Sequence, residues 1–458
     1  MSSSLLAELP YYPDSALLFD RIADEPWAIF LDSRSDCDMA GRYDMLSAAP
    51  YQTLTNRGNI TEIANRTGSR FSLDDPFQLL QQALQPFTLV DDSLPFCGGA
   101  MGYFSYDLAR RLENIPSIAE NRESLPEMAL GLYDWAVIVD HEKQRSWLTG
   151  TGRDAATAAL WPELLERFGT KVQPIERPPF RVLQPVTSNM DRARYANAFE
   201  RIKRYIQEGD CYQVNLAQCF ETAAEGHPWL AYCALRQSNP APFSAYLNTP
   251  YGQILSASPE RFLKVREGQV ETRPIKGTRP RGADPEQDAV LAEDLLTSAK
   301  DRAENLMIVD LLRNDLGKVC LPGSVRADKL FKLESYATVH HLVSTVTGQL
   351  APGKDPSDLL RACFPGGSIT GAPKLRAMEI IEELEPHRRG VYCGSIGYLG
   401  FNGSMDTSIA IRTLVHTNGQ VHFWAGGGIV DDSVMDDELR ESFDKAAAFL
   451  ALLEQFRR

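Results

Sequence analysis

The sequence predicts an α+β fold. Short runs of apolar and β-branched residues are separated by turn signals, which is typical of strands. Asn-Gly pairs join consecutive runs near the C-terminus, which indicates hairpins. The helical stretches punctuate groups of strands and do not alternate with single strands, so a doubly wound parallel sheet is disfavoured. A chain of 458 residues can also bury a large core.

Three sequence regions are expected. Residues 1–171 contain strand-like runs such as 27–31 and 135–139. Residues 172–190 form a proline-rich linker, with Pro174, Pro178, Pro179 and Pro185 close together. Residues 191–458 form the larger, C-terminal region.

The C-terminal region yields most of the predicted elements. Residues 192–209 have helical periodicity, and Tyr195, Phe199, Ile202 and Ile206 fall on one face. Further helices are predicted at 286–312, at 375–384 after Pro373, and at 437–456. Strands are predicted at 212–220, 243–247, 254–258, 391–401, 405–415 and 420–425.

Composition and charge exclude several classes of function. The net charge of −14 argues against a nucleic-acid-binding surface. No apolar run approaches the ~20 residues of a membrane span, and residues 1–6 lack a secretory signal pattern. The eight cysteines are scattered without zinc-like spacing, so they are expected to be reduced thiols of a cytoplasmic protein.

Lys276 is the most informative single residue. It lies in the segment Pro274-Ile275-Lys276-Gly277-Thr278, where prolines and a glycine favour a strand end or loop. A neutral lysine amine is a nucleophile, but deprotonation at pH 7 costs about 4.6 kcal/mol unless the site lowers the pKa. In isolation a loop lysine is usually solvated, so neighbouring motifs must decide.

Those motifs resemble the chorismate-utilising enzymes. The segments that carry the resemblance are 301–315, with Asp301-Arg302-Ala303-Glu304-Asn305, then 364–374, with Pro365-Gly366-Gly367-Ser368-Ile369-Thr370-Gly371, and 425–430, with Gly426-Gly427-Gly428. The resemblance is strong over about the last 270 residues and weak over the first 150. It implies two large, mainly antiparallel β-sheets packed face to face, with helices outside.

The resemblance also implies a Mg²⁺ site. Glu438, Glu441 and Lys445 have the i, i+3, i+7 spacing of one helix face, and Glu304 lies in a separate helical stretch. Alone, each pattern is more often a solvated surface. By resemblance, Glu304 and Glu438 are the main metal ligands, Glu441 is the next candidate and Lys445 orients them.

The remaining site residues are also implied by the resemblance. Lys276 is the nucleophile, Glu260 the general acid, and His341 an active-site histidine of less certain role. Substrate binding is expected from Arg412, which is predicted to be a strand residue, with Tyr398, Gly426, Gly427, Gly428, Ser368, Thr370 and Gln213. Glycines beside a strand can present backbone N–H groups to an anion.

Two positions separate branches of the family. Anthranilate synthases and most relatives carry alanine at position 276, so Lys276 implies the branch that aminates chorismate at C4, towards 4-aminobenzoate and folate. Isochorismate and salicylate synthases carry lysine at position 213 to activate water, and Gln213 cannot act as that base. No Gly-x-Cys-x-Gly nucleophile motif is present, so ammonia is expected from a separate glutamine amidotransferase subunit.

A second ligand pocket and two alternatives stay open. Ser33, Arg42, Tyr43, Pro242, Phe243 and Ser244 resemble the amino-acid effector pocket of anthranilate synthases, which predicts a site for tryptophan with a structural or regulatory role. The alternatives are anthranilate synthase component I, disfavoured by Lys276, and a non-catalytic subunit that binds an aromatic amino acid. Intact Glu260, Lys276, Glu304 and Glu438 argue against the latter.

Overall fold

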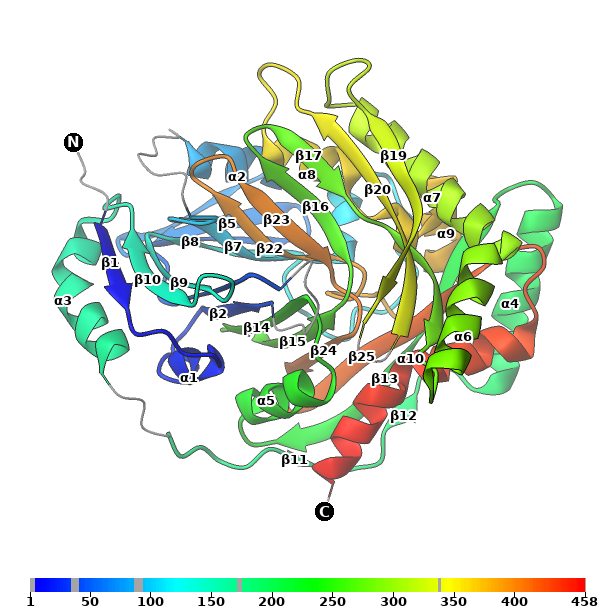
Figure 1. The fold of residues 1–458 in the computed structure, drawn as a ribbon, viewed down its shortest axis with the longest axis horizontal. Coiled ribbons are helices and arrows are strands. Elements are labelled where there is room, and N and C mark those ends of the chain that lie inside the picture. Colours follow the sequence, from blue (N-terminus) through cyan, green and yellow to red (C-terminus); the bar gives the residue numbers. More distant parts are fainter. Residues whose placement is uncertain (1–4, 34–40, 86–93, 171–174, 337–338, 458) are drawn as a thin grey trace.

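The computed structural model describes residues 5–33, 41–85, 94–170, 175–336 and 339–457. Two large antiparallel sheets form its centre, with helices on the outside (Figure 1). The predicted α+β class, with two sheets packed face to face, is therefore confirmed. Among the described residues, no helix is long and apolar enough to cross a membrane.

The first sheet has thirteen strands among the described residues. Its order is β1 (Leu5–Leu9), β10 (Arg145–Gly150), β9 (Trp135–Asp140), β3 (Tyr43–Ser47), β2 (Ala28–Asp32), β14 (Phe243–Thr249), β15 (Gly252–Ser258), β24 (Thr413–Thr417), β25 (Gln420–Ile429), β13 (Gln213–Glu225) and β11 (Arg181–Val182), with β12 (Thr187–Ser188) and β21 (Gly371–Ala372) also paired to β13.

The second sheet has twelve strands within the described ranges. Its order is β18 (Ile275–Pro280), β20 (Val339–Gln349), β17 (Gln269–Thr272), β16 (Arg261–Arg266), β23 (Met405–Ile409), β22 (Ser395–Gly400), β7 (Gly99–Phe104), β8 (Met128–Tyr133), β4 (Gln52–Arg57), β5 (Ile60–Asn65) and β6 (Gly68–Ser72), with β19 (Arg326–Ser335) also paired to β20.

Both sheets draw strands from both sides of the predicted linker. In the first sheet β2 pairs with β14, and in the second β7 pairs with β22. Residues 171–174 lie outside the described part of the chain, and β11 and β12, later in the linker, pair with β13. The division of the sequence into three regions stays a prediction, but these regions do not form separate sheets.

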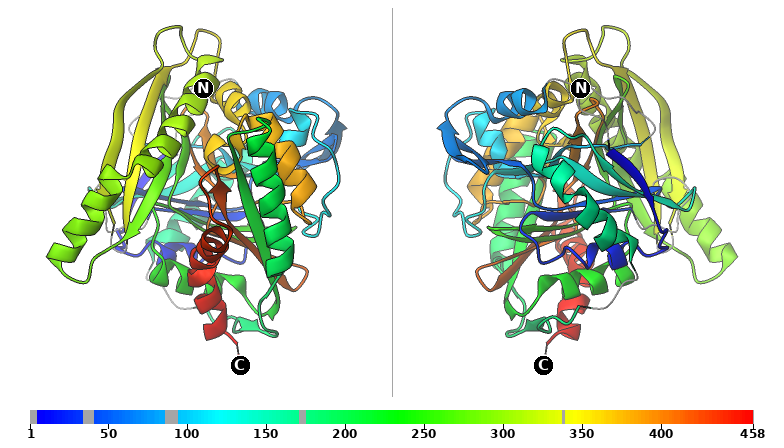
Figure 2. Two further views of the ribbon diagram at one scale, coloured as in Figure 1. Left: turned by 90° about the vertical axis from the view of Figure 1, so that its right-hand side faces the viewer. Right: turned by 90° about the vertical axis from the view of Figure 1, so that its left-hand side faces the viewer.

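The core has the layers expected of such a fold. One buried cluster combines side chains of both sheets, such as Ile29 and Ile138 of the first with Met101 and Ile396 of the second. The outer faces are covered by α1 (Ala16–Phe19), α2 (Pro76–Leu84), α3 (Ala155–Gly169), α4 (Arg192–Gln207), α5 (Pro228–Ser238), α6 (Pro285–Thr297), α7 (Ala299–Gly317), α8 (Pro356–Cys363), α9 (Lys374–Leu384) and α10 (Met435–Gln455). Figure 2 shows α10 beside α4, on the flank that also carries β13.

Two predicted elements are divided in the structure. The helix expected at 286–312 is two helices, because Ser298 leaves the helical conformation and caps α7 by accepting a hydrogen bond from the N–H of Asp301. The strand expected at 405–415 is also two strands. The chain leaves β23 in the second sheet, passes through residues 410–412 and enters β24 in the first sheet.

Arg412 is therefore not a strand residue, contrary to prediction. It has a left-handed backbone with φ of 52° in the crossing between the sheets. Its side chain is aimed by an irregular segment rather than by the alternation of a strand.

Candidate active site

Two crossings between the sheets lie side by side and carry two of the predicted site residues. One crossing joins β15 to β16 and contains Glu260, and the other contains Arg412. The N–H of Ile409 donates to the carbonyl of Glu260 at 3.0 Å, and the N–H of Ala257 donates to the carbonyl of Arg412 at 2.8 Å. Glu260 and Arg412 are thus fixed where the two sheets meet.

Glu260 is buried beside Lys276. Only 6% of Glu260 is exposed, and burial raises the pKa of its carboxyl to about 7, against the opposing effects of a hydrogen bond from Ser368 and the charge of Lys276. Burial also lowers the pKa of Lys276, although the carboxylates of Glu304 and Glu260 oppose that shift. Both shifts are towards the protonated acid and the neutral amine, which are the forms that the predicted chemistry needs.

Lys276 is aimed by an irregularity of its strand. The register of β18 against β20 shifts between Ile275 and Thr278. Gly277 has φ of 86°, and a β-carbon there would meet Asp301 at 3.0 Å. A bulge of this kind turns side chains out of the regular alternation. Arg279 then ties the strand to α7 through Asp301, 3.0 Å away.

The predicted metal ligands lie close to this pair. Burial raises the pKa of Glu304, and Asp301 and Glu438 reinforce the shift. Burial likewise raises the pKa of Glu438, which is 5% exposed and accepts a hydrogen bond from Ser433 at 2.6 Å. Two helices from different parts of the chain, α7 and α10, thus supply carboxyls that act on one another electrostatically.

Glu441 and Lys445 share the face of α10 that carries Glu438. Lys445 lies 2.6 Å from Glu441 and donates to the carbonyl of Gly426 at 2.9 Å. Gly427 makes room for the carboxylates, because a β-carbon there would lie 2.9 Å from Oε2 of Glu438 and 3.5 Å from Oε1 of Glu441. Three lysines, Lys276, Lys300 and Lys445, also act electrostatically on this group.

The carboxylates are not assembled as a ready-made ligand cage. Within the described ranges, no group of three His, Cys, Asp or Glu side chains is close enough to hold a metal ion. The pair Glu304 and Glu438 nevertheless fits a divalent cation, since the charge of Glu438 helps to raise the pKa of Glu304, the charge of Glu441 helps to raise that of Glu438, and a cation would relieve this repulsion. Mg²⁺ is usually held by one or two carboxylates and several waters.

Gln213 packs against Gly428, which follows Gly427 in the strand beside the carboxylates. Gln213 is fully buried, and neither amide atom of its side chain has a hydrogen-bond partner in the structure. A β-carbon on residue 428 would lie 2.7 Å from Nε2 of Gln213, so Gly428 allows the amide to pack there. An unsatisfied buried amide is costly and is often satisfied by a ligand or water.

A cationic end of the site is formed by Arg412 and His341. Burial and the charge of Arg412 lower the pKa of His341 to about 4, so this imidazole is neutral at pH 7. Its Nδ1 lies 2.9 Å from the hydroxyl of Thr278. Burial also lowers the pKa of Arg412, while Tyr392 opposes the shift. Arg412 is half-buried and makes no ion pair with a carboxylate of the described residues, and such an arginine suits an anionic ligand.

Tyr398 does not join Arg412, and the residue beside Arg412 is Tyr392. Tyr398 lines a different cavity and packs edge-to-face on Phe96, with ring centres 5.4 Å apart. Tyr392 lies just before β22 and opposes the lowering of the pKa of Arg412. The N–H of Cys393 donates to the carbonyl of Ala410 at 2.9 Å, which holds this segment beside the crossing that contains Arg412.

The segment from Gly366 to Ala372 brings Ser368 to the centre of the site. The carbonyl of Ser368 accepts a hydrogen bond from Nζ of Lys276 at 3.1 Å. Thr370 is fully buried, and its hydroxyl donates to the carbonyl of Gly366 within its own loop. The structure thus turns Thr370 towards its own backbone rather than towards a substrate.

Arg389 was not predicted from the sequence. It is buried and donates to the carbonyl of Ile369 at 2.9 Å.

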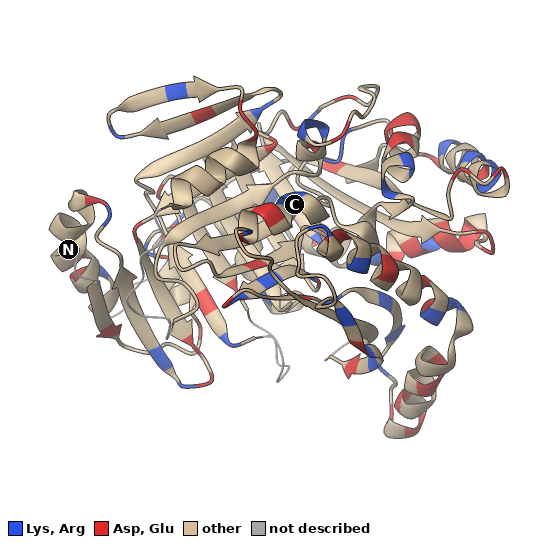
Figure 3. Ribbon diagram, turned by 90° about the horizontal axis from the view of Figure 1, so that it is seen from above, with Lys and Arg blue, Asp and Glu red and all other residues tan. Residues whose placement is uncertain are grey.

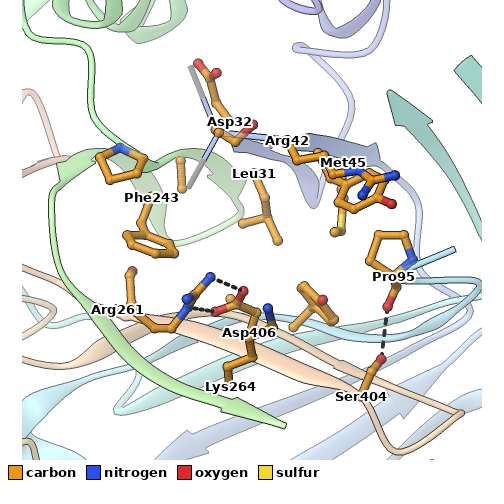
Figure 4. Close-up of a pocket in the computed structure, with 18 of the residues that line it drawn as sticks. Leu31, Asp32, Arg42, Met45, Pro95, Phe243, Arg261, Lys264, Ser404 and Asp406 are labelled. Carbon is orange, nitrogen blue, oxygen red and sulfur yellow. Dashed lines mark hydrogen bonds and ion pairs between the residues drawn. The ribbon is translucent and has the colours of Figure 1, made fainter. Parts of the chain in front are cut away.

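A separate cavity of about 860 Å³ lies where the amino-acid pocket is predicted (Figure 4). All six residues predicted for it line the cavity: Ser33, Arg42, Tyr43, Pro242, Phe243 and Ser244. Arg261, the neighbour of Glu260 in the sequence, also lines it and pairs with Asp406 at 2.9 Å. Figure 4 shows Phe243 and Arg261 on one side of the cavity and Arg42, Met45 and Pro95 on the other.

Comparisons with known proteins agree with this geometry. A family model described as chorismate binding enzyme matches residues 39–451. Aminodeoxychorismate synthase component 1 of Salmonella typhimurium is 49% identical over 99% of both chains, and that of Escherichia coli is 49% identical over 95% of both chains. The crystal structure of anthranilate synthase component I from Streptococcus pneumoniae has a TM-score of 0.81 and 32% identity, covering 90% of this chain and 93% of that one.

Proposed function

This chain belongs to the chorismate binding enzymes, and on that premise we propose that it aminates chorismate to 4-amino-4-deoxychorismate, the precursor of 4-aminobenzoate and folate. Lys276 is the observation that carries the choice of reaction within the family. A lysine amine held beside a buried carboxylic acid can form a covalent intermediate, which direct addition of ammonia at C2 does not need.

Two displacements account for the reaction. The neutral amine of Lys276 forms a C2–N bond while the C4–O bond breaks, and Glu260 gives its proton to the departing hydroxyl, which leaves as water. Ammonia then forms the C4–N bond while the C2–N bond breaks, and the electron pair returns to Lys276. Each displacement shifts both conjugated double bonds of the ring, and together they restore the original positions. The raised pKa of Glu260 and the lowered pKa of Lys276 support this assignment.

The acidic group formed by Glu304, Glu438 and Glu441 would hold Mg²⁺. The cation would neutralise the ring carboxylate of chorismate, which otherwise faces an acidic surface. Glu304 and Glu438 are the main ligands in this proposal, because Glu304 is half-buried, Glu438 is buried, and burial raises the pKa of both carboxyls. Glu441 is half exposed and paired with Lys445, so it is the weaker candidate.

The other end of the substrate would lie against Arg412, Tyr392 and the neutral His341. Arg412 supplies the charge and Tyr392 a hydroxyl for the enolpyruvyl carboxylate. Gly427 and Gly428 allow close approach of the backbone on the carboxylate side. The unpartnered amide of Gln213 offers a donor and an acceptor but no base, which is consistent with amination rather than hydration.

Ammonia would come from a glutamine amidotransferase subunit. The name component 1, carried by the two relatives, implies that those enzymes have a second component. The separate cavity lined by Phe243 would take tryptophan, whose amino and carboxylate groups match acidic and basic residues of the lining, such as Glu142 and Arg42. Arg261 lines this cavity and follows Glu260 in the sequence. A ligand bound in the cavity would therefore help to hold Glu260 in position.

Product analysis tests the proposal. The purified chain, given chorismate, Mg²⁺ and ammonium at alkaline pH, should release 4-amino-4-deoxychorismate, identified by chromatography and mass. Glutamine as the sole nitrogen source should give no product without the partner subunit. Anthranilate as the main product would overturn the proposal in favour of the anthranilate synthase alternative, and the absence of any conversion would favour the non-catalytic one.

A further inference from the structure

Arg389 is a buried arginine that joins three segments of the chain. Its side chain is only 1% exposed, and it follows α9 in the sequence. Its guanidinium donates two hydrogen bonds to the carboxylate of Glu385, at 2.9 and 2.7 Å, one to the carbonyl of Ile369 at 2.9 Å and one to the carbonyl of Asn215 at 2.7 Å. These partners lie at the end of α9, in the turn Gly367–Ile369 and in β13, so one planar group holds all three segments.

The turn connects Arg389 to the amine of Lys276. The carbonyl of Ser368 accepts a hydrogen bond from Nζ of Lys276 at 3.1 Å, and the carbonyl of the next residue, Ile369, accepts the one from Arg389. Only the two soft dihedrals of Ile369 separate these two carbonyls, because the peptide units themselves are planar. A shift of the Ile369 carbonyl would therefore move the carbonyl that holds the lysine.

The same guanidinium attaches the turn to β13. Asn215, whose carbonyl it contacts, pairs with Gly428 in the strand that carries the glycine run. Glu385 also accepts a hydrogen bond from the N–H of Ala217 at 2.9 Å, so the ion pair contacts β13 at two places. The turn that contacts the nucleophile and the strand beside the acidic group are thus held by one buried ion pair.

We propose that Arg389 is a positioning residue, whose guanidinium fixes the turn Gly367–Ile369 against β13 and so sets the place of the Lys276 amine, a role that rests on the proposed function. Its hydrogen bonds go to protein groups, and it is shielded from solvent. Arg389 therefore acts through the turn, whereas Arg412 is the arginine proposed to contact the substrate.

Two variants separate this role from that of an ordinary buried ion pair. Arg389→Lys keeps the positive charge beside Glu385, but one ammonium nitrogen cannot replace three guanidinium nitrogens, so at least one of the two carbonyls should be released. The double variant Arg389→Met/Glu385→Gln removes both charges together. It leaves no unpaired charge in the interior, and replacements of this kind are often neutral for stability.

Both variants should lower kcat more than they change the KM for chorismate. A displacement of about 1 Å can cost ~10²-fold in rate, so kcat should fall ~10- to 100-fold. The KM should stay within ~3-fold of the native value, because the groups proposed to bind chorismate are unchanged. The rate of adduct formation on Lys276, followed by intact mass after mixing with chorismate without ammonia, should fall by the same factor as kcat.

Arg177→Lys is the matched control. The side chain of Arg177 is 3% exposed, lies 3.0 Å from Asp24 and donates to the carbonyl of Asp20 at 2.6 Å. This variant also exchanges a shielded, paired arginine for lysine, but outside the proposed active site. It should therefore keep the native kcat and the native rate of adduct formation, whatever its melting temperature.

Amide hydrogen exchange of the substrate-free protein tests the attachment of the turn without turnover. The N–H of Asn215 donates to the carbonyl of Thr370 at 2.8 Å, so this amide reports on the contact between β13 and the turn. In both Arg389 variants, peptides that cover residues 213–217 and 366–372 should exchange at least ~10-fold faster, whereas peptides of α3 should keep the native rate.

Each contrary outcome is distinct. A native kcat in either folded variant would overturn the proposal, and so would a raised KM with native kcat, which would make the turn a substrate contact. If Arg389→Lys fails to fold, the double variant carries the test, and a double variant that also fails to fold would give Arg389 a purely structural role and refute the proposal. Failure of the native chain to form aminodeoxychorismate, with faster exchange at residues 366–372 in the variants, would count against the reaction alone.

Discussion

A β-carbon on residue 427 would lie 2.9 Å from Oε2 of Glu438, so Gly427 leaves the space that this carboxylate fills. A β-carbon there would also lie 3.5 Å from Oε1 of Glu441, and the carbonyl of the preceding residue, Gly426, accepts a hydrogen bond from Lys445. The glycine run of β25 is thus a steric requirement of the acidic group on α10.

Gly427→Ala should weaken metal activation. The methyl group would push the carboxylates of Glu438 and Glu441 out of position, and displaced ligands of this kind cost about 10- to 100-fold in metal affinity. The measurement is the Mg²⁺ dependence of turnover together with Mn²⁺ binding by electron paramagnetic resonance. Gly169→Ala, at an open helix end with no atom within 4 Å, is the matched control. Native Mn²⁺ affinity in Gly427→Ala would contradict the assigned site.

The pH dependence should report Glu260. Burial raises the pKa of this carboxyl to about 7, and the acid is needed in its protonated form, so kcat/KM should fall as pH rises through about 7. Glu260→Gln should lose ~10²- to 10⁴-fold in rate and lose that limb. A limb near pH 7 that persists in Glu260→Gln would assign it to another group.

The same residue links activity to stability. A carboxyl whose folded pKa lies above its unfolded value stabilises the protein fully below the unfolded pKa, and this contribution is lost as pH rises through the folded pKa. Glu260→Gln should therefore unfold at a higher temperature than the native chain above pH 7, and the difference should shrink towards pH 4. Equal melting temperatures across this range would show that burial does not perturb Glu260.

Tyr392 and Tyr398 should differ in their effects. Tyr392→Phe and Arg412→Lys should each raise the KM for chorismate, by about 10-fold or more for the arginine, because a charged hydrogen bond is lost or weakened. Tyr398→Phe should leave that KM close to native, since Tyr398 lines the other cavity. Steady-state kinetics on the three variants tests the pair, and the reverse pattern would restore Tyr398 to the substrate site.

Much of the fold could be predicted because its signals are local. The Asn402-Gly403 turn and the apolar runs around it predict the hairpin of β22 and β23. The crossing at residues 410–412 could not be predicted, because the run from Met405 to Val415 contains no glycine or proline and both halves are buried strands. Periodicity cannot show that a continuous apolar run changes sheets.

The site was harder to predict because its contacts are distant in sequence. Lys276 and Ser368 lie 92 residues apart, and no spacing rule relates them. The spacing of Glu438, Glu441 and Lys445 did place them on one helix face, and the structure shows Lys445 paired to Glu441. Tyr398 was assigned to the substrate by resemblance, and nothing in the sequence indicated Tyr392, which acts on Arg412 in the structure.

The amino-acid cavity should bind tryptophan. A ligand that binds only the folded state stabilises it, by ~2.7 kcal/mol at a hundred times its Kd. Added tryptophan should therefore raise the melting temperature, or, if it is already bound, appear by mass spectrometry when the protein is denatured. Phe243→Ala should abolish either effect, and Phe71→Ala, on an exposed strand, should not. If neither a shift in melting temperature nor release of tryptophan were observed, tryptophan would be excluded as the occupant.

Covalent trapping of Lys276 is the sharpest prediction. Chorismate without ammonia should leave an adduct on this lysine, visible by intact mass and mapped by proteolysis, because the second displacement lacks its nucleophile. The adduct should form faster as pH rises through a lysine pKa below the ordinary value, since burial favours the neutral amine that attacks. Lys276→Ala should lose the adduct and most amination at C4, with some drift to product substituted at C2, whereas Lys143→Ala, exposed on a turn, should behave as the native chain. If Lys276 stayed unmodified during a single turnover, and Lys276→Ala still made aminodeoxychorismate at the native rate, both the covalent mechanism and the role of this lysine would be wrong.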